Sequence, residues 1–158
     1  MAREARRVRK DWKHPKDGSG RYVPLFDGTV FAKNTASWDE AARKWREGFC
    51  SDYKGGWVPL TDDQKAQSYG SWDGERPDPG DYMPLWKDDE RTHLMMYENS
   101  TPGTPISPAF PTAEELARWL VDHDAHWFDD LTTSYEVWLA IIEDPINSAA
   151  IIVPAGSR

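Results

Sequence analysis

The sequence predicts an α+β fold, in which a small, mostly antiparallel sheet is packed by about three helices, with long proline-anchored loops between them. Three observations lead to this class. Residues 92–98 read THLMMYE, a short run that is apolar on both alternating faces, as in a covered strand. Three other segments place apolar residues at helical spacing behind a Ser or Thr. The 12 prolines favour extended, irregular connections.

The helices are expected at about 38–49, 113–122 and 134–143. Each begins at a capping box, in which a Ser or Thr side chain accepts a backbone N–H three residues on while a Glu reaches back. The three pairs are Ser37 with Glu40, Thr112 with Glu115, and Thr133 with Glu136. A shorter helical turn is expected after Thr61, which is paired in the same way with Gln64.

Two other stretches are expected to be loops. Residues 101–111 contain four prolines and should be extended without regular pairing, because each proline removes a backbone donor. Residues 70–80 are rich in Gly, Pro and Asp, which is typical of turns. The apolar residues 149–153 are expected to form a further short strand of the sheet.

Charge divides the chain into an arm and a body. Residues 1–16 contain seven Lys or Arg against Glu4 and Asp11, a net charge of +5, while the whole chain of 158 residues carries −8. We therefore expect residues 1–17 to be a basic N-terminal arm, mobile or helical, and residues 18–158 to be a single domain. The arm has few apolar groups, so its removal is expected to leave the fold intact.

The arm supplies a weak nucleic-acid candidate. Its contacts would come from four cationic side chains: Arg6, Arg7, Arg9 and Lys10. The acidic body opposes the approach of phosphate, and Trp12 is the only aromatic residue of the arm that could stack on a base. Any such binding is therefore expected to be indifferent to sequence and largely lost at physiological salt.

Composition also bounds the compartment. Cys50 is the only cysteine, so no intramolecular disulfide is possible and a reducing compartment fits. The chain shows no charged-then-apolar leader and no apolar run long enough to span a bilayer. We expect a cytoplasmic protein without a membrane partner.

A short phrase occurs three times: RYVPL at 21–25, GWVPL at 56–60 and DYMPL at 81–85. One interpretation is three extended hooks, in which the proline sets the backbone while the aromatic residue and the leucine dock on the core. The other interpretation is a composite aromatic groove for a partner's peptide. Its residues are Tyr22, Trp57, Tyr82 and Trp86.

No catalytic residue can be nominated from the sequence. It lacks a Gly-x-Ser-x-Gly elbow, a phosphate loop and a dinucleotide fingerprint, and Cys50 closes a predicted helix, where it is expected to pack. A metal site is conceivable in the segment DHDAHWFDD, with four ligands: His123, His126, Asp122 and Asp124. The alternative is an acidic, solvated loop between helices, and we expect no cofactor.

Four phrases resemble a family of uncharacterised proteins from tailed phages and prophages of enteric bacteria. They are SPAFPTAEELARWL, TTSYEVWLAII, VRKDWKHPKDGSGRYVPLFDG and ERPDPGDYMPLWKDDERTHLMMYE, which together cover most of the chain. The resemblance implies a phage accessory protein that works in the bacterial cytoplasm. It implies no catalytic residue. Family members carry small polar residues in place of the two histidines, and some longer members have a Cys-rich zinc-binding segment that this chain lacks.

Two functions from different classes follow from these observations. The first is a non-enzymatic protein that binds a host protein and inhibits a defence or nucleic-acid enzyme, because an acidic surface can occupy a nucleic-acid channel by charge mimicry. The second is a small metal-dependent hydrolase that uses the His123 and His126 cluster. An interaction protein is the main expectation.

Overall fold

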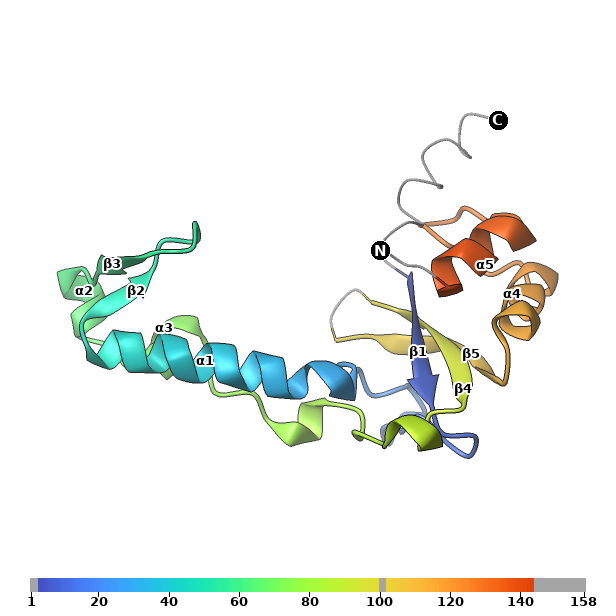
Figure 1. Cartoon of the computed structure of the whole chain (residues 1–158), viewed down its shortest axis with the longest axis horizontal. Helices are drawn as coiled ribbons and strands as arrows, with labels where there is room; N and C mark the ends of the chain where they lie inside the picture. Colours follow the sequence, from blue (N-terminus) through green and yellow to red (C-terminus); the bar gives the residue numbers. More distant parts are fainter. Residues whose placement is uncertain (1–2, 100–101, 144–158) are drawn as a thin grey trace. The chain divides into compact units, whose positions relative to one another are not determined.

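The structure, a computed structural model, describes residues 3–99 and 102–143 (Figure 1). The chain divides into two compact units: unit 1 takes in residues 1–26 and 84–158, and unit 2 is residues 27–83. The predicted α+β class is confirmed, because helices and two small antiparallel sheets are both present. The expected domain from residue 18 to 158 is not one unit, since residues 27–83 pack mainly among themselves. The expected strand at 149–153 lies outside the described residues.

The sheet of unit 1 has three antiparallel strands in the order β1-β4-β5. They are β1 (Arg3–Val8), β4 (His93–Glu98) and β5 (Thr104–Phe110). The strand predicted at 92–98 is confirmed as β4, the central strand. Its Met95, Met96 and Tyr97 are all buried, so both faces of the sheet are covered.

Strand β1 corrects the expected N-terminal arm. It pairs along its length with β4, from Arg3 opposite Glu98 to Val8 opposite His93. Arg6 is 2% exposed and Val8 is fully buried, so the segment contributes to the core. The strand was not expected because every charged residue of this segment was taken to be exposed, whereas one of its arginines lies inside the protein.

The buried guanidinium of Arg6 is satisfied on several sides. Its Nη1 donates to the Leu25 carbonyl at 2.8 Å, its Nη2 to the Pro102 carbonyl at 3.0 Å, and its Nε to the Glu4 carboxylate at 2.8 Å. Its Cζ atom lies 4.3 Å from the centre of the Tyr97 ring. Paired donors and an aromatic face are the conditions under which a charge is tolerated in a core.

Strand β5 corrects the second expectation, an unpaired loop at 101–111. The segment pairs with β4 despite its prolines, because β5 is an outer strand, where a missing N–H costs no ladder bond. The register shifts between Met95 and Tyr97. Within this bulge the Met96 N–H donates to the Ser107 hydroxyl at 2.8 Å, so a side chain replaces a carbonyl partner.

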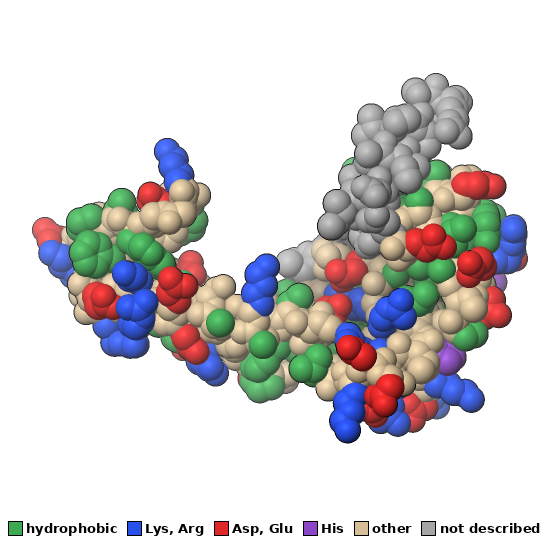
Figure 2. Space-filling model, in the orientation of Figure 1, with side chains coloured by type: hydrophobic (Ala, Val, Ile, Leu, Met, Phe, Trp, Pro, Cys, Tyr) green, Lys and Arg blue, Asp and Glu red, His purple; other side chains and the backbone are tan. Residues whose placement is uncertain are grey.

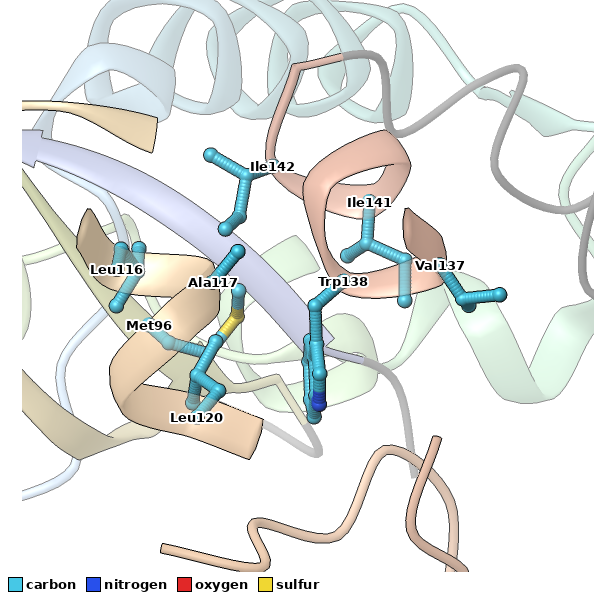
Figure 3. Packing of buried hydrophobic residues seen from close by; sticks show 8 residues of the cluster. All are labelled: Met96, Leu116, Ala117, Leu120, Val137, Trp138, Ile141 and Ile142. Carbon is cyan, nitrogen blue, oxygen red and sulfur yellow. The ribbon is translucent and has the colours of Figure 1, made fainter. Parts of the chain in front are cut away.

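One face of the sheet packs on α4 (Ala113–Asp122) and α5 (Tyr135–Glu143). The helix predicted at 113–122 is confirmed, and the Thr112 side chain accepts the Glu115 N–H as expected. The helix predicted at 134–143 is also confirmed, but Ser134, not Thr133, accepts the Val137 N–H at its start. Figure 3 shows the core between these elements. It comprises Met96, Leu116, Ala117, Leu120, Val137, Trp138, Ile141 and Ile142.

Unit 2 is built around α1 (Phe31–Arg46), which is preceded by a 3-10 turn, η1 (Gly28–Val30). The helix begins seven residues before the predicted 38, and Ser37 lies inside it. The Asp27 side chain caps the preceding turn by accepting the Thr29 N–H. Of the three helices expected on the β1-β4-β5 sheet, α1 therefore belongs to unit 2.

The rest of unit 2 consists of short elements. They are β2 (Phe49–Ser51), β3 (Trp57–Pro59), α2 (Asp62–Lys65), α3 (Tyr69–Asp73) and the 3-10 turn η2 (Pro79–Asp81). Strands β2 and β3 form an antiparallel hairpin. The capping box of Thr61 and Gln64 is confirmed. Helix α3 occupies part of the loop expected at 70–80, and Cys50 lies in β2 instead of closing a helix.

We predict that Gly103→Ala destabilises the protein by at least about 2 kcal/mol in free energy of unfolding. Gly103 has a φ of +116°, and a Cβ atom there would lie 2.8 Å from both Arg6 Nη2 and the Glu98 carbonyl oxygen. Gly18→Ala is the control, because nothing lies within 4 Å of its added Cβ. Urea unfolding of both variants measures the difference in stability, and equal unfolding midpoints would contradict the prediction.

We further predict that Arg6→Met lowers the free energy of unfolding by about 2 kcal/mol or more, because it removes hydrogen bonds from a charged donor inside the protein. The control is Arg7→Met at the exposed neighbouring position of β1, which should change stability by less than about 0.5 kcal/mol. Thermal and urea melts measure both. A pair of indistinguishable melts would show that the Arg6 contacts contribute nothing net.

Candidate functional site

Residues 9–25 cover the second face of the unit 1 sheet and are linked to Tyr97 by hydrogen bonds. Trp12 Nε1–H donates to the Tyr97 hydroxyl at 3.1 Å, and the same hydroxyl lies 3.0 Å from His14 Nδ1. His14 Nε2 lies 2.6 Å from the Val23 carbonyl oxygen, which can only accept. Nε2 therefore carries the proton, and in the neutral ring Nδ1 accepts from Tyr97. This chain of hydrogen bonds orients the indole and the imidazole together.

The environment keeps His14 neutral. Burial lowers the pKa of His14 below its ordinary value of 6.5, and the nearby charge of Arg6 lowers it further, against the hydrogen bond to the Val23 carbonyl. His14 is thus a positioning group between the N-terminal segment and β4.

An aromatic row extends from this network. The ring centres of Trp86 and Trp12 are 5.0 Å apart, those of Trp12 and His14 are 5.8 Å apart, and those of His14 and Tyr22 are 5.7 Å apart, all in edge-on geometry. Two of the four predicted partner-binding residues, Tyr22 and Trp86, thus lie at the two ends of one row.

Beside this row lies a cleft of about 730 Å³, which we call the lysine cleft. It runs between the N-terminal segment and strand β5, and its floor includes Met95 and residues 105–109. Its functional side chains are three lysines and three aromatic residues, Lys10, Lys13, Lys16, Trp12, Tyr22 and Trp119. A cleft of this size, lined by both apolar and charged groups, has the dimensions of a ligand site.

The lysines give the cleft a positive charge. Lys10, Lys13 and Lys16 are exposed, and among the residues that the structure describes none of the three forms an ion pair. The Lys16 ammonium lies 4.9 Å from the centre of the Tyr22 ring. The neighbouring Arg9 is already paired, with Asp11 at 3.2 Å and a longer contact to Glu90.

The Asp17 side chain, an acidic group close to the lysines in the sequence, is held by hydrogen bonds within its own turn. The Asp17 carboxylate accepts hydrogen bonds from the Ser19 hydroxyl and N–H and from the Arg21 N–H. The Ser19 hydroxyl and then these backbone groups lower the pKa of Asp17. Asp17 thus stays ionised and is held by its own turn, and among the described residues it forms no ion pair with the lysines of the cleft.

The predicted nucleic-acid set is only partly placed at this cleft. Arg6 is buried and cannot contact a ligand, and Arg7 lies on β1 outside the cleft lining. Arg9 is in ion pairs, which leaves Lys10 in the lining. Lys13 and Lys16, which belong to the predicted basic arm, also line the cleft, and Trp119 was missed. The three-residue spacing of the lysines around Trp12 was a visible signal, whereas Trp119 reaches the cleft only through the packing of α4.

The other two predicted partner-binding residues, Trp57 and Tyr82, lie in unit 2 and are not brought together. The Tyr82 ring packs 4.9 Å from Phe31, and its hydroxyl accepts from Asn34. Trp57 instead lies 5.5 Å from the Lys44 ammonium. Positions 34 and 44 of α1 are about 15 Å apart along the helix axis. Unit 2 thus forms no composite groove from these two residues.

The β2–β3 hairpin of unit 2 is the second candidate surface. Phe49 is 39% exposed, Val58 is 40% exposed, and Tyr53 near its turn is 86% exposed. Phe49 pairs with Pro59 and Val58 pairs with Cys50, so the two apolar side chains lie on opposite faces of the hairpin. Figure 2 shows apolar side chains gathered over the hairpin and α2.

The predicted metal cluster is not assembled. The His123 ring stacks on Trp119 with ring centres 4.0 Å apart, and its Nδ1 lies 2.9 Å from the Trp119 carbonyl oxygen. His126 is exposed, and its backbone carbonyl accepts from Arg3. Asp122 and Asp124 are exposed as well. Across residues 3–99 and 102–143, no group of three or more His, Cys, Asp or Glu side chains is placed to hold a metal ion.

Within the described part of the chain, no helix is both long enough and apolar enough to cross a membrane.

We predict that the free energy of unfolding falls as the pH falls below about 6.5, partly because of His14. The folded-state pKa of His14 is lower than the unfolded value of 6.5, so between these two values the unfolded chain binds more protons. The contribution is complete above pH 6.5 and is lost toward lower pH, by up to about 1.4 kcal/mol per pH unit. Urea melts from pH 7.5 to pH 5 should show a shallower pH dependence in His14→Gln. Identical slopes would contradict this assignment.

Comparison of the chain with protein-family models, with curated proteins and with solved structures found no match.

Proposed function

We propose that the protein acts by binding another protein, and that the β2–β3 hairpin of unit 2 supplies the contact. The observation that supports this is the thin core of unit 2. In residues 27–83, all of which the structure describes, four apolar side chains are buried, namely Ala42, Trp45, Leu60 and Met83. A unit of this size is marginal unless a disulfide, a metal or a partner stabilises it.

The exposed side chains of unit 2 indicate where the partner binds. Phe49, Tyr53 and Val58 on the hairpin and Trp72 on α3 are all substantially exposed. Aromatic side chains are enriched at protein interfaces, since they bury a large area with little loss of conformational freedom. A two-stranded hairpin is also marginal by itself and gains stability when a second surface covers it. Burying this hairpin therefore stabilises both the complex and unit 2.

Charge indicates the chemistry of the partner. Unit 2 contains seven Lys or Arg against eleven Asp or Glu, a net charge of −4. Asp52 lies in the hairpin turn, and Asp62 and Asp63 follow β3 in the first turn of α2. A hairpin with apolar side chains on both faces and acidic neighbours complements apolar groups with a basic rim. We propose a partner of this kind.

The resemblance to tailed-phage proteins suggests where such a partner is found. We propose a protein of the host bacterium, met in its cytoplasm, and inhibition as the result of binding. A basic rim is typical of enzymes that handle nucleic acid, so a defence or nucleic-acid enzyme fits this surface. The net charge of −8 on the whole chain is in keeping with competition for a cationic channel.

Affinity capture with matched variants tests the proposal. We expect the wild-type protein to retain a specific protein from a lysate of an enteric bacterium, and Phe49→Ser with Val58→Ser to reduce its recovery at least about tenfold. The control is Phe128→Ser with Leu131→Ser, which removes two apolar side chains of similar exposure from unit 1. Circular dichroism melts confirm that both double variants fold.

Two results would overturn this function. One is equal recovery of the partner by the hairpin variant and the control variant. The other is the absence of any protein that the wild type retains at moderate salt and the hairpin variant does not.

A further inference from the structure

We propose that the lysine cleft of unit 1 binds single-stranded nucleic acid, an activity separate from the protein contact assigned to unit 2. The cleft combines three ammonium groups that lack ion-pair partners among the described residues with three aromatic rings in its walls. Cations for phosphates and ring faces for bases are the two components of sites that hold unpaired strands.

The three lysines are positioned to contact the phosphates of a nucleic-acid backbone. Lys10, Lys13 and Lys16 recur every third residue of a non-helical segment, and all three line the same cleft. Successive lysines are three residues apart, a separation of at most about 10 Å along the chain, so the ammonium groups can meet different phosphates of one strand. A single small anion would engage one or two of them and leave the rest unpaired.

The rings are placed for bases. Trp12 comes from the N-terminal segment and Tyr22 lies beyond a turn. Trp119 comes from α4 and already has the His123 ring stacked on one face, which leaves its other face for a base. The Tyr22 side chain is strongly exposed, and Trp12 is oriented by its hydrogen bond to Tyr97. A duplex hides the faces of its bases whereas a single strand presents them, so stacking selects the unpaired form.

Strand β5 disfavours the obvious alternative, an acidic peptide that adds a strand to the sheet. Pro105 and Pro108 lie in β5 beside the cleft and offer no N–H. Prolines on an outer strand interrupt the main-chain ladder on which strand addition depends. Recognition in this cleft therefore rests on side-chain charge and stacking.

The acidic total charge does not prevent this binding. At physiological salt, charges separated by more than about 8 Å are largely screened. Close to the cleft, Asp11 and Glu90 pair with Arg9, and Asp17 is held in its own turn. The expectation from the sequence, weak binding that is largely lost at physiological salt, assumed an arm with Trp12 as its only aromatic residue. In the fold, Tyr22 and Trp119 stand beside it.

Fluorescence anisotropy with a labelled oligothymidylate of about 12 nucleotides tests the proposal on the full chain. At low salt we expect binding, with log K falling against log salt with a slope of about −2, as for three phosphates on a single strand. A duplex of equal length should bind at least about tenfold more weakly. Lys10→Gln, Lys13→Gln and Lys16→Gln together should weaken binding at least about tenfold and flatten the slope.

Two further variants separate the cleft from general charge. Lys33→Gln, Lys54→Gln and Lys65→Gln together make the same change in net charge on exposed lysines of unit 2 and should leave affinity unchanged. Tyr22→Leu keeps an apolar side chain but removes the ring, and should weaken binding about fivefold. Both triple variants are checked by thermal melts.

Three results overturn the proposal. The first is no binding of the oligonucleotide at low salt. The second is an equal loss of affinity in the two triple variants. The third is displacement of the oligonucleotide by polyglutamate at comparable charge concentration, which would assign the cleft to an acidic polypeptide. None of these results depends on the hairpin, so the two proposals fail separately.

Discussion

A single buried guanidinium links three segments of unit 1. Arg6 joins strand β1 to the carbonyls of Leu25 and Pro102, two segments far from it in the chain. It also lies over the Tyr97 ring, whose hydroxyl orients Trp12 and His14. The desolvation cost of the charge is offset only while all these groups are in place. Strand pairing, the N-terminal covering segment and the wall of the lysine cleft therefore depend on one another.

Local signals predicted the fold well where one segment contains all the determining contacts. The cap and apolar face of α4 lie within ten residues, and β4 carries its own alternation. Strands β1 and β5 were missed because their pairing comes from β4, and because arginine and proline argue against strands in isolation. The early start of α1 was missed because its first two turns carry little apolar pattern. The spacing of the lysines could be read from the sequence, but the position of Trp119 in the cleft depends on tertiary packing.

The two units differ in how they use apolar residues. Unit 1 has a core of eight buried side chains between its sheet and two helices, together with a cationic cleft between its N-terminal segment and β5. Unit 2 buries few apolar groups and leaves large ones on the hairpin. A well-packed unit can present a preformed site that loses little conformational entropy on binding. A thinly packed unit instead gains stability from what it binds.

The insertion of unit 2 has a consequence for folding kinetics. Val8 pairs with His93, so β1 and β4 of the unit 1 sheet meet only when a loop of 84 residues, 9–92, has closed. Closing a long loop costs entropy, and a high sequence separation slows folding. The Tyr82 ring, however, lies 4.9 Å from Phe31, so the two ends of unit 2 are held together inside that unit. If unit 2 forms first, it brings β1 and β4 closer together and so shortens the loop that remains to be closed. Folding of unit 2, the more thinly packed unit, then sets the folding rate of unit 1.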